Sequence, residues 1–72
     1  MDHLYHINVF WSQDDGCWIA DVPDLRPCSG HGDNPADAVS AVEDAITLWL
    51  EVTRERGHPV PAPRYRAATD AA

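Results

Sequence analysis

The chain has 72 residues, 44% of them hydrophobic, which suffices for one small domain and is too apolar for a disordered segment. Twelve acidic residues against five arginines, with no lysine, give a formal charge of −7, so binding of nucleic acid through phosphate contacts is not expected. The charge either keeps the chain soluble or suits docking on a basic protein, and a core of this size, worth about 3–5 kcal/mol, favours self-association or a bound partner.

A β-hairpin is expected near the start of the chain. Residues 4–11 alternate in character with period two and predict a strand with one buried face. An Asp-Gly pair within residues 12–16 supplies turn chemistry, and residues 17–22 form the returning strand. Tyr5, Ile7, Val9 and Trp11 are expected on one face of the first strand, with a more mixed set on the other face. On the second strand, Trp18, Ala20 and Val22 are expected on the face opposite Cys17, Ile19 and Asp21.

Two prolines interrupt the chain after this hairpin. Pro23 ends the strand pairing because it has no N–H to donate, and Pro27 interrupts pairing again for the same reason. Leu25, between them, is expected to point inward as an anchor. Residues 26–31 predict a short third strand, whose small side chains would let a helix or a neighbouring backbone come close.

A long helix is expected from Pro35 to about Arg56. Asp33 or Asn34 is the N-cap, Asp37 suits the positive end of the helix dipole, and Gly57 ends the helix. Two neighbouring apolar rows run along it, and together they are wider than one sheet contact needs. Either the helix is a well-covered core element or it has a second interface with another copy or a partner, for which the candidates are Leu48, Trp49 and Val52.

The part of the chain after the helix is expected to be extended. Residues 58–63 alternate proline with other residues, which excludes a central strand and allows a short edge strand lying on the body. Residues 1–66 are expected to form a single domain, and residues 67–72 a disordered tail.

Patterns for catalysis or metal binding are weak. The four histidines are widely spaced, and His3 and His6 would point to opposite faces of a strand, which argues against a shared zinc ion. The helix acids lie mainly on a solvated face, no serine sits in a nucleophile elbow, and a pairing of Cys28 with His31 leaves little room for a substrate cleft. The chain is therefore expected to be a non-enzyme without metal or cofactor.

The cysteines and the hydropathy pattern bear on the compartment. Cys17 and Cys28 have no short metal-ligand spacing, and a disulfide between them stays open as an alternative to two free thiols. The sequence shows no signal-peptide pattern, and no apolar run approaches the roughly 18 residues of a membrane span. We expect a cytoplasmic protein with reduced cysteines and no membrane partner.

The stretch GCWIADVPDLRPCSGHGDNPADAVSAVEDAITLWLE resembles the HicB antitoxin family. That family carries an apolar strand, a Pro-Asp-Leu-Pro-Gly-Cys-like bend, Gly-Asp-Thr, and an Ala-rich acidic helix. The Pro-alternating end also resembles the family, although Arg26-Pro27 stands where the family has Pro-Gly. The counterparts in this chain are Val22-Pro23-Asp24-Leu25, Cys28, Gly32-Asp33-Asn34, the helix from Pro35, and residues 57–63, so the resemblance covers residues 4–64.

The resemblance implies an α+β fold of the partial RNase H-like kind, in the order β-β-β-α-β. It has a three-stranded antiparallel sheet, one long helix packed on a face, and a short fourth edge strand. It also implies an antitoxin that covers the RNA-binding and catalytic surface of a small, basic, mRNA-cleaving toxin of the HicA type. The C-terminal DNA-binding domain of many family members has no counterpart here, so a short form is expected.

A basic toxin would need acidic groups for pairing and apolar anchors for affinity. The candidate contacts are Trp11, Asp14, Asp15, Trp18, Asp21 and Asp24, with core and solvated-turn roles as the alternative. A homodimer or homotetramer is expected. Two other functions stay open: a standalone oligomeric scaffold or regulator without a toxin, and a degenerate RNase H-like nuclease. The nuclease is disfavoured because active members of that fold carry an Asp in the middle of the first strand, by resemblance, and this chain does not.

Overall fold

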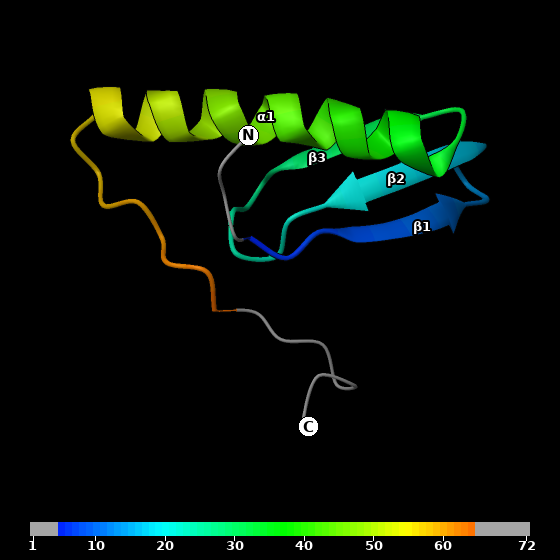
Figure 1. Ribbon diagram of the computed structural model, residues 1–72, viewed down its shortest axis with the longest axis horizontal. Coiled ribbons are helices and arrows are strands. Elements are labelled where there is room, and N and C mark those ends of the chain that lie inside the picture. Colours follow the sequence, from blue (N-terminus) through cyan, green and yellow to red (C-terminus); the bar gives the residue numbers. More distant parts are fainter. Residues whose placement is uncertain (1–4, 65–72) are drawn as a thin grey trace.

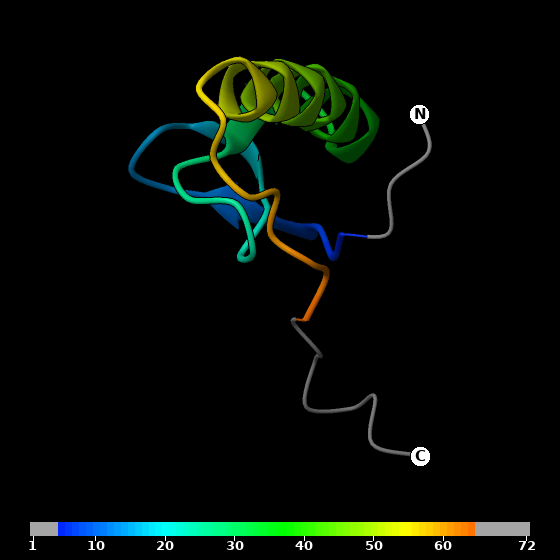
Figure 2. The same ribbon diagram turned by 90° about the vertical axis from the view of Figure 1, so that its left-hand side faces the viewer.

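The computed structural model describes residues 5–64 and shows an α+β fold with three strands followed by one helix. The strands β1, β2 and β3 form one antiparallel sheet in that order, and α1 lies along one of its faces (Figure 1). Seen along the helix, the domain has two layers, with the sheet below α1 (Figure 2). This confirms the predicted α+β architecture. The bounds are Asn8–Ser12 for β1, Cys17–Asp21 for β2, Ser29–Gly32 for β3 and Pro35–Glu55 for α1.

The register of the sheet decides which side chains share the face below the helix. Trp11 lies opposite Trp18, and Trp18 lies opposite Gly32, so these three positions form one row across the sheet. Phe10, Ile19 and His31 form a row on the other face. The predicted division of the first two strands into two faces is therefore confirmed.

Small residues in β3 allow the helix to come close. A Cβ atom on Gly30 would lie 2.5 Å from the backbone nitrogen of Val42, and one on Gly32 would lie 2.5 Å from the Cβ of Asp37. The helix backbone thus rests almost directly on the strand, so of the two expected neighbours, a helix or another backbone segment, it is the helix that comes close. Because these two positions carry no side chain, α1 packs mainly over β3 and β2 and contacts β1 much less.

The buried core is small and lies between α1, β2 and the bend that follows β2. Leu25 is fully buried there, as predicted, and the bend around it is closed by hydrogen bonds from the Val22 N–H to the Cys28 carbonyl, 3.1 Å, and from the Leu25 N–H to the Val22 carbonyl, 3.2 Å. The buried hydrophobic residues are Ala20, Val22, Leu25, Cys28, Ala38, Val42 and Ile46.

The helix begins and ends where local chemistry predicts. The side chain of Asn34 accepts a hydrogen bond from the Asp37 N–H at 2.9 Å, which identifies Asn34 rather than Asp33 as the N-cap. At the other end Gly57 adopts a φ of 71°, a left-handed conformation that glycine reaches at little cost.

Strand β1 departs from the prediction in two ways. It begins at Asn8 rather than at residue 4, and its larger side chains are not covered: Phe10 and Trp11 are 46% and 50% exposed. The expected buried face is limited to Tyr5 and Ile7, which precede the strand and pack against the core. The reason is the position of α1, which covers β3 and β2 and reaches β1 only weakly.

The expected fourth strand is not formed in the part of the chain that the structure covers. Residues 58–64 are extended but pair with no strand, because the three prolines among them donate no backbone hydrogen bond. This segment is held by isolated contacts instead. The Tyr5 hydroxyl donates to the Pro61 carbonyl, and the Arg64 N–H donates to the Asp24 carboxylate at 2.9 Å. The tail predicted for residues 67–72 lies outside the described residues.

Candidate protein-binding site

Trp11 and Trp18 form an aromatic pair at the turn end of the hairpin. Their ring centroids are 5.8 Å apart and their planes meet at 70°, an edge-to-face arrangement. Trp18 is partly buried against the core, whereas Trp11 is half exposed at the edge of the sheet. Trp11 is thus an exposed aromatic side chain whose neighbour is fixed, which is the kind of residue that anchors protein contacts.

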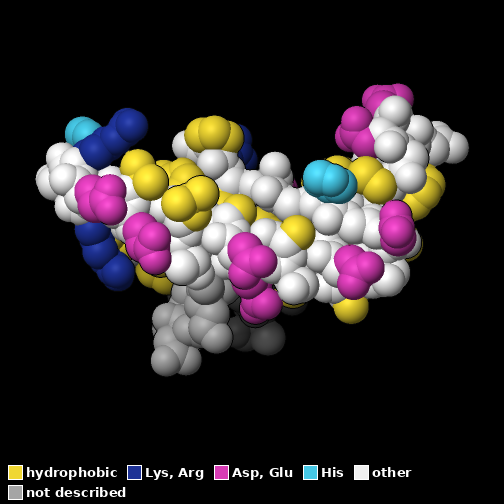
Figure 3. Space-filling model, turned by 90° about the horizontal axis from the view of Figure 1, so that it is seen from above, with side chains coloured by type: hydrophobic (Ala, Val, Ile, Leu, Met, Phe, Trp, Pro, Cys, Tyr) yellow, Lys and Arg dark blue, Asp and Glu magenta, His cyan; other side chains and the backbone are white. Residues whose placement is uncertain are grey.

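The turn between β1 and β2 places two carboxylates next to this pair. Ser12 lies opposite Cys17 one step beyond the tryptophans, and its carbonyl accepts a hydrogen bond from the Gly16 N–H at 2.8 Å. The Ser12 hydroxyl donates to the Asp15 carboxylate at 3.0 Å, so that charge is held in place, while Asp14 is exposed at the tip. Acidic and apolar side chains adjoin at this end of the molecule (Figure 3, far right).

A third carboxylate, that of Asp37, lies in the first turn of the helix, above the sheet partner of Trp18. Gly32 lies opposite Trp18 in the sheet and directly below Asp37, so the first turn of α1 stands beside Trp18. The Asp37 carboxylate accepts a hydrogen bond from the Asn34 side-chain amide at 3.1 Å. Sequence reasoning assigned Asp37 only to the helix dipole. The two glycines of β3, which bring the helix onto the strand, were the signal that could have placed it here.

Asp21 and Asp24 lie away from this cluster. Asp21 is at the other end of β2, about 13 Å from Cys17 for a strand rising roughly 3.3 Å per residue, and it lies on the opposite face from Trp18. Its Oδ1 is buried and has no hydrogen-bond partner within residues 5–64. The Asp24 carboxylate accepts a hydrogen bond from the Arg64 N–H. The six predicted contact residues therefore fall into two groups, one with Trp11, Trp18, Asp14 and Asp15 and one with Asp21 and Asp24.

Two exposed apolar residues of β1 were not singled out from the sequence. Val9 lies on the same face as Trp11, and Phe10 lies on the open face of the sheet. Three consecutive large apolar residues in the first strand were the available signal. Their exposure followed only once the helix was seen to lie over the other two strands.

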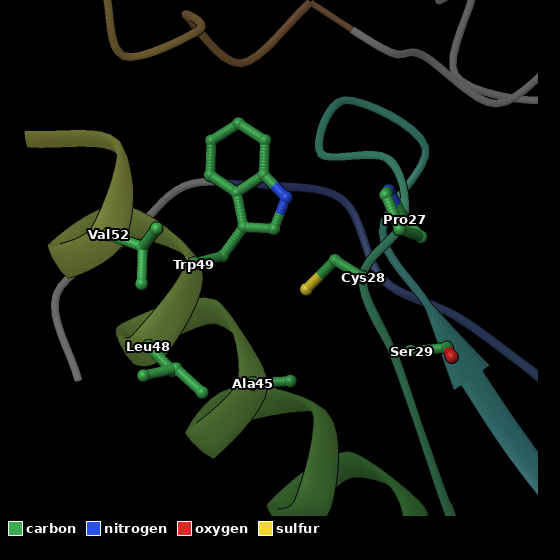
Figure 4. A pocket seen from close by; sticks show the side chains of 7 residues that line it. All are labelled: Pro27, Cys28, Ser29, Ala45, Leu48, Trp49 and Val52. Atoms are coloured by element: carbon green, nitrogen blue, oxygen red, sulfur yellow. The ribbon is translucent and has the colours of Figure 1, made fainter. Parts of the chain in front are cut away.

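The predicted self-association residues lie together in the second half of α1, near the start of β3 and away from the hairpin turn. Leu48, Trp49 and Val52 line one wall of a groove beside the start of β3, and Leu48 is 61% exposed. In Figure 4, Trp49 and Ala45 approach the groove from α1 while the strand-side residues form the facing wall. That facing wall consists of Pro27, Cys28 and Ser29.

Among the titratable groups of residues 5–64, burial shifts the pKa of Cys28 and of Tyr5. Both cysteines are free thiols, and burial raises the pKa of Cys28, which disfavours the reactive thiolate. Burial, and then the Asp24 carboxylate, raise the pKa of Tyr5. Within residues 5–64 the His, Cys, Asp and Glu side chains form no group of three or more able to hold a metal ion. In the same part of the chain α1 is too polar to serve as a membrane-spanning helix.

These features define a small two-layer α+β domain with exposed aromatic and acidic side chains at its hairpin turn. The chain matches a family model over residues 5–71. That family is described as HicB_like antitoxin of bacterial toxin-antitoxin system, and the chain belongs to it, which confirms the resemblance seen in the sequence. No match was found among curated proteins, and none among solved structures.

Proposed function

We propose that this protein is an antitoxin that neutralises a small, basic, mRNA-cleaving toxin of the HicA type by covering its RNA-binding and catalytic surface. Membership of an antitoxin family supports the existence of a toxin partner. The observation that supports the docking site is the half-exposed Trp11 set among carboxylates at the hairpin end of the domain.

The hairpin end combines negative charge with exposed apolar surface, and a contact with a basic protein needs both. Asp14, Asp15 and Asp37 supply negative charge that attracts a basic surface during encounter and opposes acidic competitors. Trp11 supplies apolar area at low entropic cost, because Trp18 already restricts one side of its ring. Since the Ser12 hydroxyl holds the Asp15 carboxylate, part of the charge is positioned before binding.

The mode of action proposed here is occupancy. An RNA-cleaving toxin binds phosphate through basic groups, and an acidic protein bound to those groups excludes the RNA. One antitoxin site would silence one toxin for as long as the complex lasts, without chemistry on either partner. Since the toxin's substrate is mRNA, the antitoxin would act in the cytoplasm, where the two free thiols also fit.

Titration calorimetry against the small basic toxin that the proposal expects to be encoded beside this chain would test the site. We expect Asp14→Lys combined with Asp15→Lys to weaken binding by about 1–3 kcal/mol, since like charges would meet in a partly desolvated contact. The matched control makes the same charge change on the exposed helix surface, with Glu51→Lys and Glu55→Lys. Raising the salt concentration should shrink the difference between the two pairs.

Trp11→Ala separates the aromatic anchor from the charges. We expect it to weaken binding by about 2 kcal/mol or more if Trp11 is a central anchor, with little loss of folding stability because the side chain is half exposed. Equal losses for the two charge-reversal pairs, together with unchanged binding by Trp11→Ala, would rule out the hairpin site. Failure of the unmodified chain to bind the neighbouring protein at all would favour a standalone oligomeric scaffold.

A further inference from the structure

Strand β1 forms the edge of the sheet that lies away from the helix. Among residues 5–64 it pairs with β2 alone, and Figure 1 shows it as the strand farthest from α1. In an antiparallel ladder, alternate residues turn their N–H and C=O groups away from the neighbouring strand. On the outer side of β1 these groups meet no other strand of the described chain. This side is therefore open to pairing.

The sequence of β1 lacks the features with which proteins usually protect an exposed edge. Those features are charged side chains, proline and β-bulges. The strand reads Asn-Val-Phe-Trp-Ser, with no charge and no proline, and its five residues pair with β2 in an unbroken register. At roughly 3.4 Å per residue the edge is about 17 Å long. It is thus long enough for a partner strand of about five residues.

The exposed apolar side chains of β1 lie on both faces of the sheet. Val9 and Trp11, 38% and 50% exposed, are on the face on which α1 packs, and Phe10, 46% exposed, is on the open face. A helix or loop laid on one face would cover only one of these two sets. A strand added in the plane of the sheet carries side chains on both faces, directly beside those of its neighbour. Strand addition therefore accounts for the exposure on both faces.

We propose that the toxin docks by strand addition. An extended segment of the toxin pairs with the outer side of β1 and extends the three-stranded sheet by one strand. This inference rests on the function proposed above and specifies how the toxin is held. Main-chain hydrogen bonds to β1 supply affinity, and the side chains of the added strand supply specificity by packing beside Val9, Phe10 and Trp11.

The surroundings of β1 define the chemistry of the added strand. Because β1 carries no charge, apolar side chains, above all β-branched and aromatic ones, suit the positions beside its exposed residues. Just beyond Ser12 the turn carries the exposed Asp14 and Asp15. A lysine or arginine at that end of the added strand pairs with these carboxylates. The occupant is thus a short apolar strand with a basic residue at one end, as a basic protein would supply.

Charge disfavours a second copy of this chain as the occupant. Two β1 strands paired antiparallel about Phe10 would set Ser12 of each copy beside Asn8 of the other. Since Asn8 lies opposite Asp21 in the sheet, the acidic turn of one copy would approach Asp21 of its partner. Neither β1 nor β2 contains a cation that would offset this repulsion. A basic toxin meets the same carboxylates with attraction.

Hydrogen exchange, followed by NMR on the full chain with and without the small basic toxin, tests the strand pairing. In the complex, amides at alternate positions of residues 8–12 should exchange on the order of tenfold more slowly, because they become hydrogen-bonded. The other edge of the sheet, residues 29–32, is the internal control and should keep its exchange rates. A complex with unchanged exchange throughout residues 8–12 would overturn strand addition and leave the antitoxin function standing. Slow exchange of every amide in residues 8–12 before the toxin is added would overturn it too, since the edge would already be paired.

Alanine variants on the two faces of β1 give an independent test by titration calorimetry. Phe10→Ala and Trp11→Ala should each weaken toxin binding by roughly tenfold, because the added strand packs beside both side chains. The matched control is Val60→Ala, since Val60 is 40% exposed but lies outside the sheet, and it should keep the affinity of the unmodified chain. Circular dichroism should show that all three variants remain folded.

The outcomes of the calorimetry separate this inference from the function on which it rests. A loss with Trp11→Ala but not with Phe10→Ala would show docking on one face of the sheet, and strand addition would be wrong while the antitoxin function stands. If the unmodified chain forms no complex with the toxin, both the strand addition and the proposed function are wrong.

Discussion

Gly30 of β3 lies directly below Val42 of α1, so close that a Cβ on Gly30 would stand 2.5 Å from the Val42 backbone nitrogen. The obstructing atom belongs to the helix backbone and cannot move aside as a flexible side chain would. We therefore expect Gly30→Ala to push the helix from the sheet and to lower the free energy of unfolding by about 1–3 kcal/mol or more.

Urea unfolding followed by tryptophan fluorescence would measure this loss. The matched control is Ser29→Ala at the adjacent, exposed position of the same strand, which should change stability by no more than about 0.5 kcal/mol. Equal stability of the two variants would contradict the close packing of α1 on β3.

The N-cap of the helix gives a second prediction. The Asn34 side chain accepts the Asp37 N–H at 2.9 Å and donates to the Asp37 carboxylate at 3.1 Å. Asn34→Ala removes both contacts and should destabilise the protein by about 0.5–2 kcal/mol in thermal or urea unfolding. Asp33→Ala is the control, since the cap is Asn34, and it should have the smaller effect. A larger effect at Asp33 would show that the helix starts one residue earlier.

The contact between Tyr5 and the segment after the helix predicts a dependence on alkaline pH. The Tyr5 hydroxyl donates to the Pro61 carbonyl, and burial, followed by the nearby Asp24 carboxylate, raises the pKa of Tyr5 above the ordinary value of 10.0. The neutral hydroxyl is thus favoured in the folded state. Its contribution to stability is complete below pH 10 and is lost as the pH rises through the folded-state pKa.

Tyr5→Phe tests this dependence. At neutral pH the variant should be less stable than the unmodified chain by about 0.5–1.5 kcal/mol, the usual net value of one hydrogen bond. Above pH 10 the difference should shrink, because the unmodified chain loses the donor on ionisation while the variant has none to lose. Urea unfolding at intervals between pH 7 and 11 would follow it. A difference that stays constant over this range would contradict the assignment.

The two thiols should react at different rates. Cys28 is buried and its pKa is raised by burial, so little thiolate is present and access is poor. Cys17 is partly exposed at the start of β2. With a chromogenic disulfide reagent near pH 8, we expect the Cys28→Ser variant, which retains Cys17, to react on the order of tenfold faster than Cys17→Ser. Adding denaturant should abolish the difference, and equal rates under native conditions would contradict the burial of Cys28.

Local chemistry allowed much of the fold to be predicted. Several features depend only on residues close together in the chain. They are the Asp-Gly turn, the alternation of the first two strands, and the start of the helix at Pro35 and its end at Gly57. The same holds for the small residues of β3. They predicted that another segment packs closely on this strand, but not which turn of the helix does so. These features needed no knowledge of distant contacts.

Other features depended on where the helix settles across the sheet. Because Gly30 and Gly32 draw α1 over β3, the strand β1 stays uncovered and Trp11 is exposed, which the alternation alone did not reveal. The prolines after the helix excluded a central strand, but only the structure shows that they leave this segment without any strand partner in the described part of the chain.

The sequence by itself determined the composition of the surface, the order of the elements and the family, because charge, capping and periodicity are local properties. The tertiary structure decided which of the predicted contact residues lie together. It placed Asp37 above Gly32, the sheet partner of Trp18, set Asp21 on the opposite face from Trp18, and brought Leu48 into a groove beside the start of β3. Such neighbourhoods arise when the helix and sheet pack, and packing joins residues whose separation along the chain carries no signal of their contact.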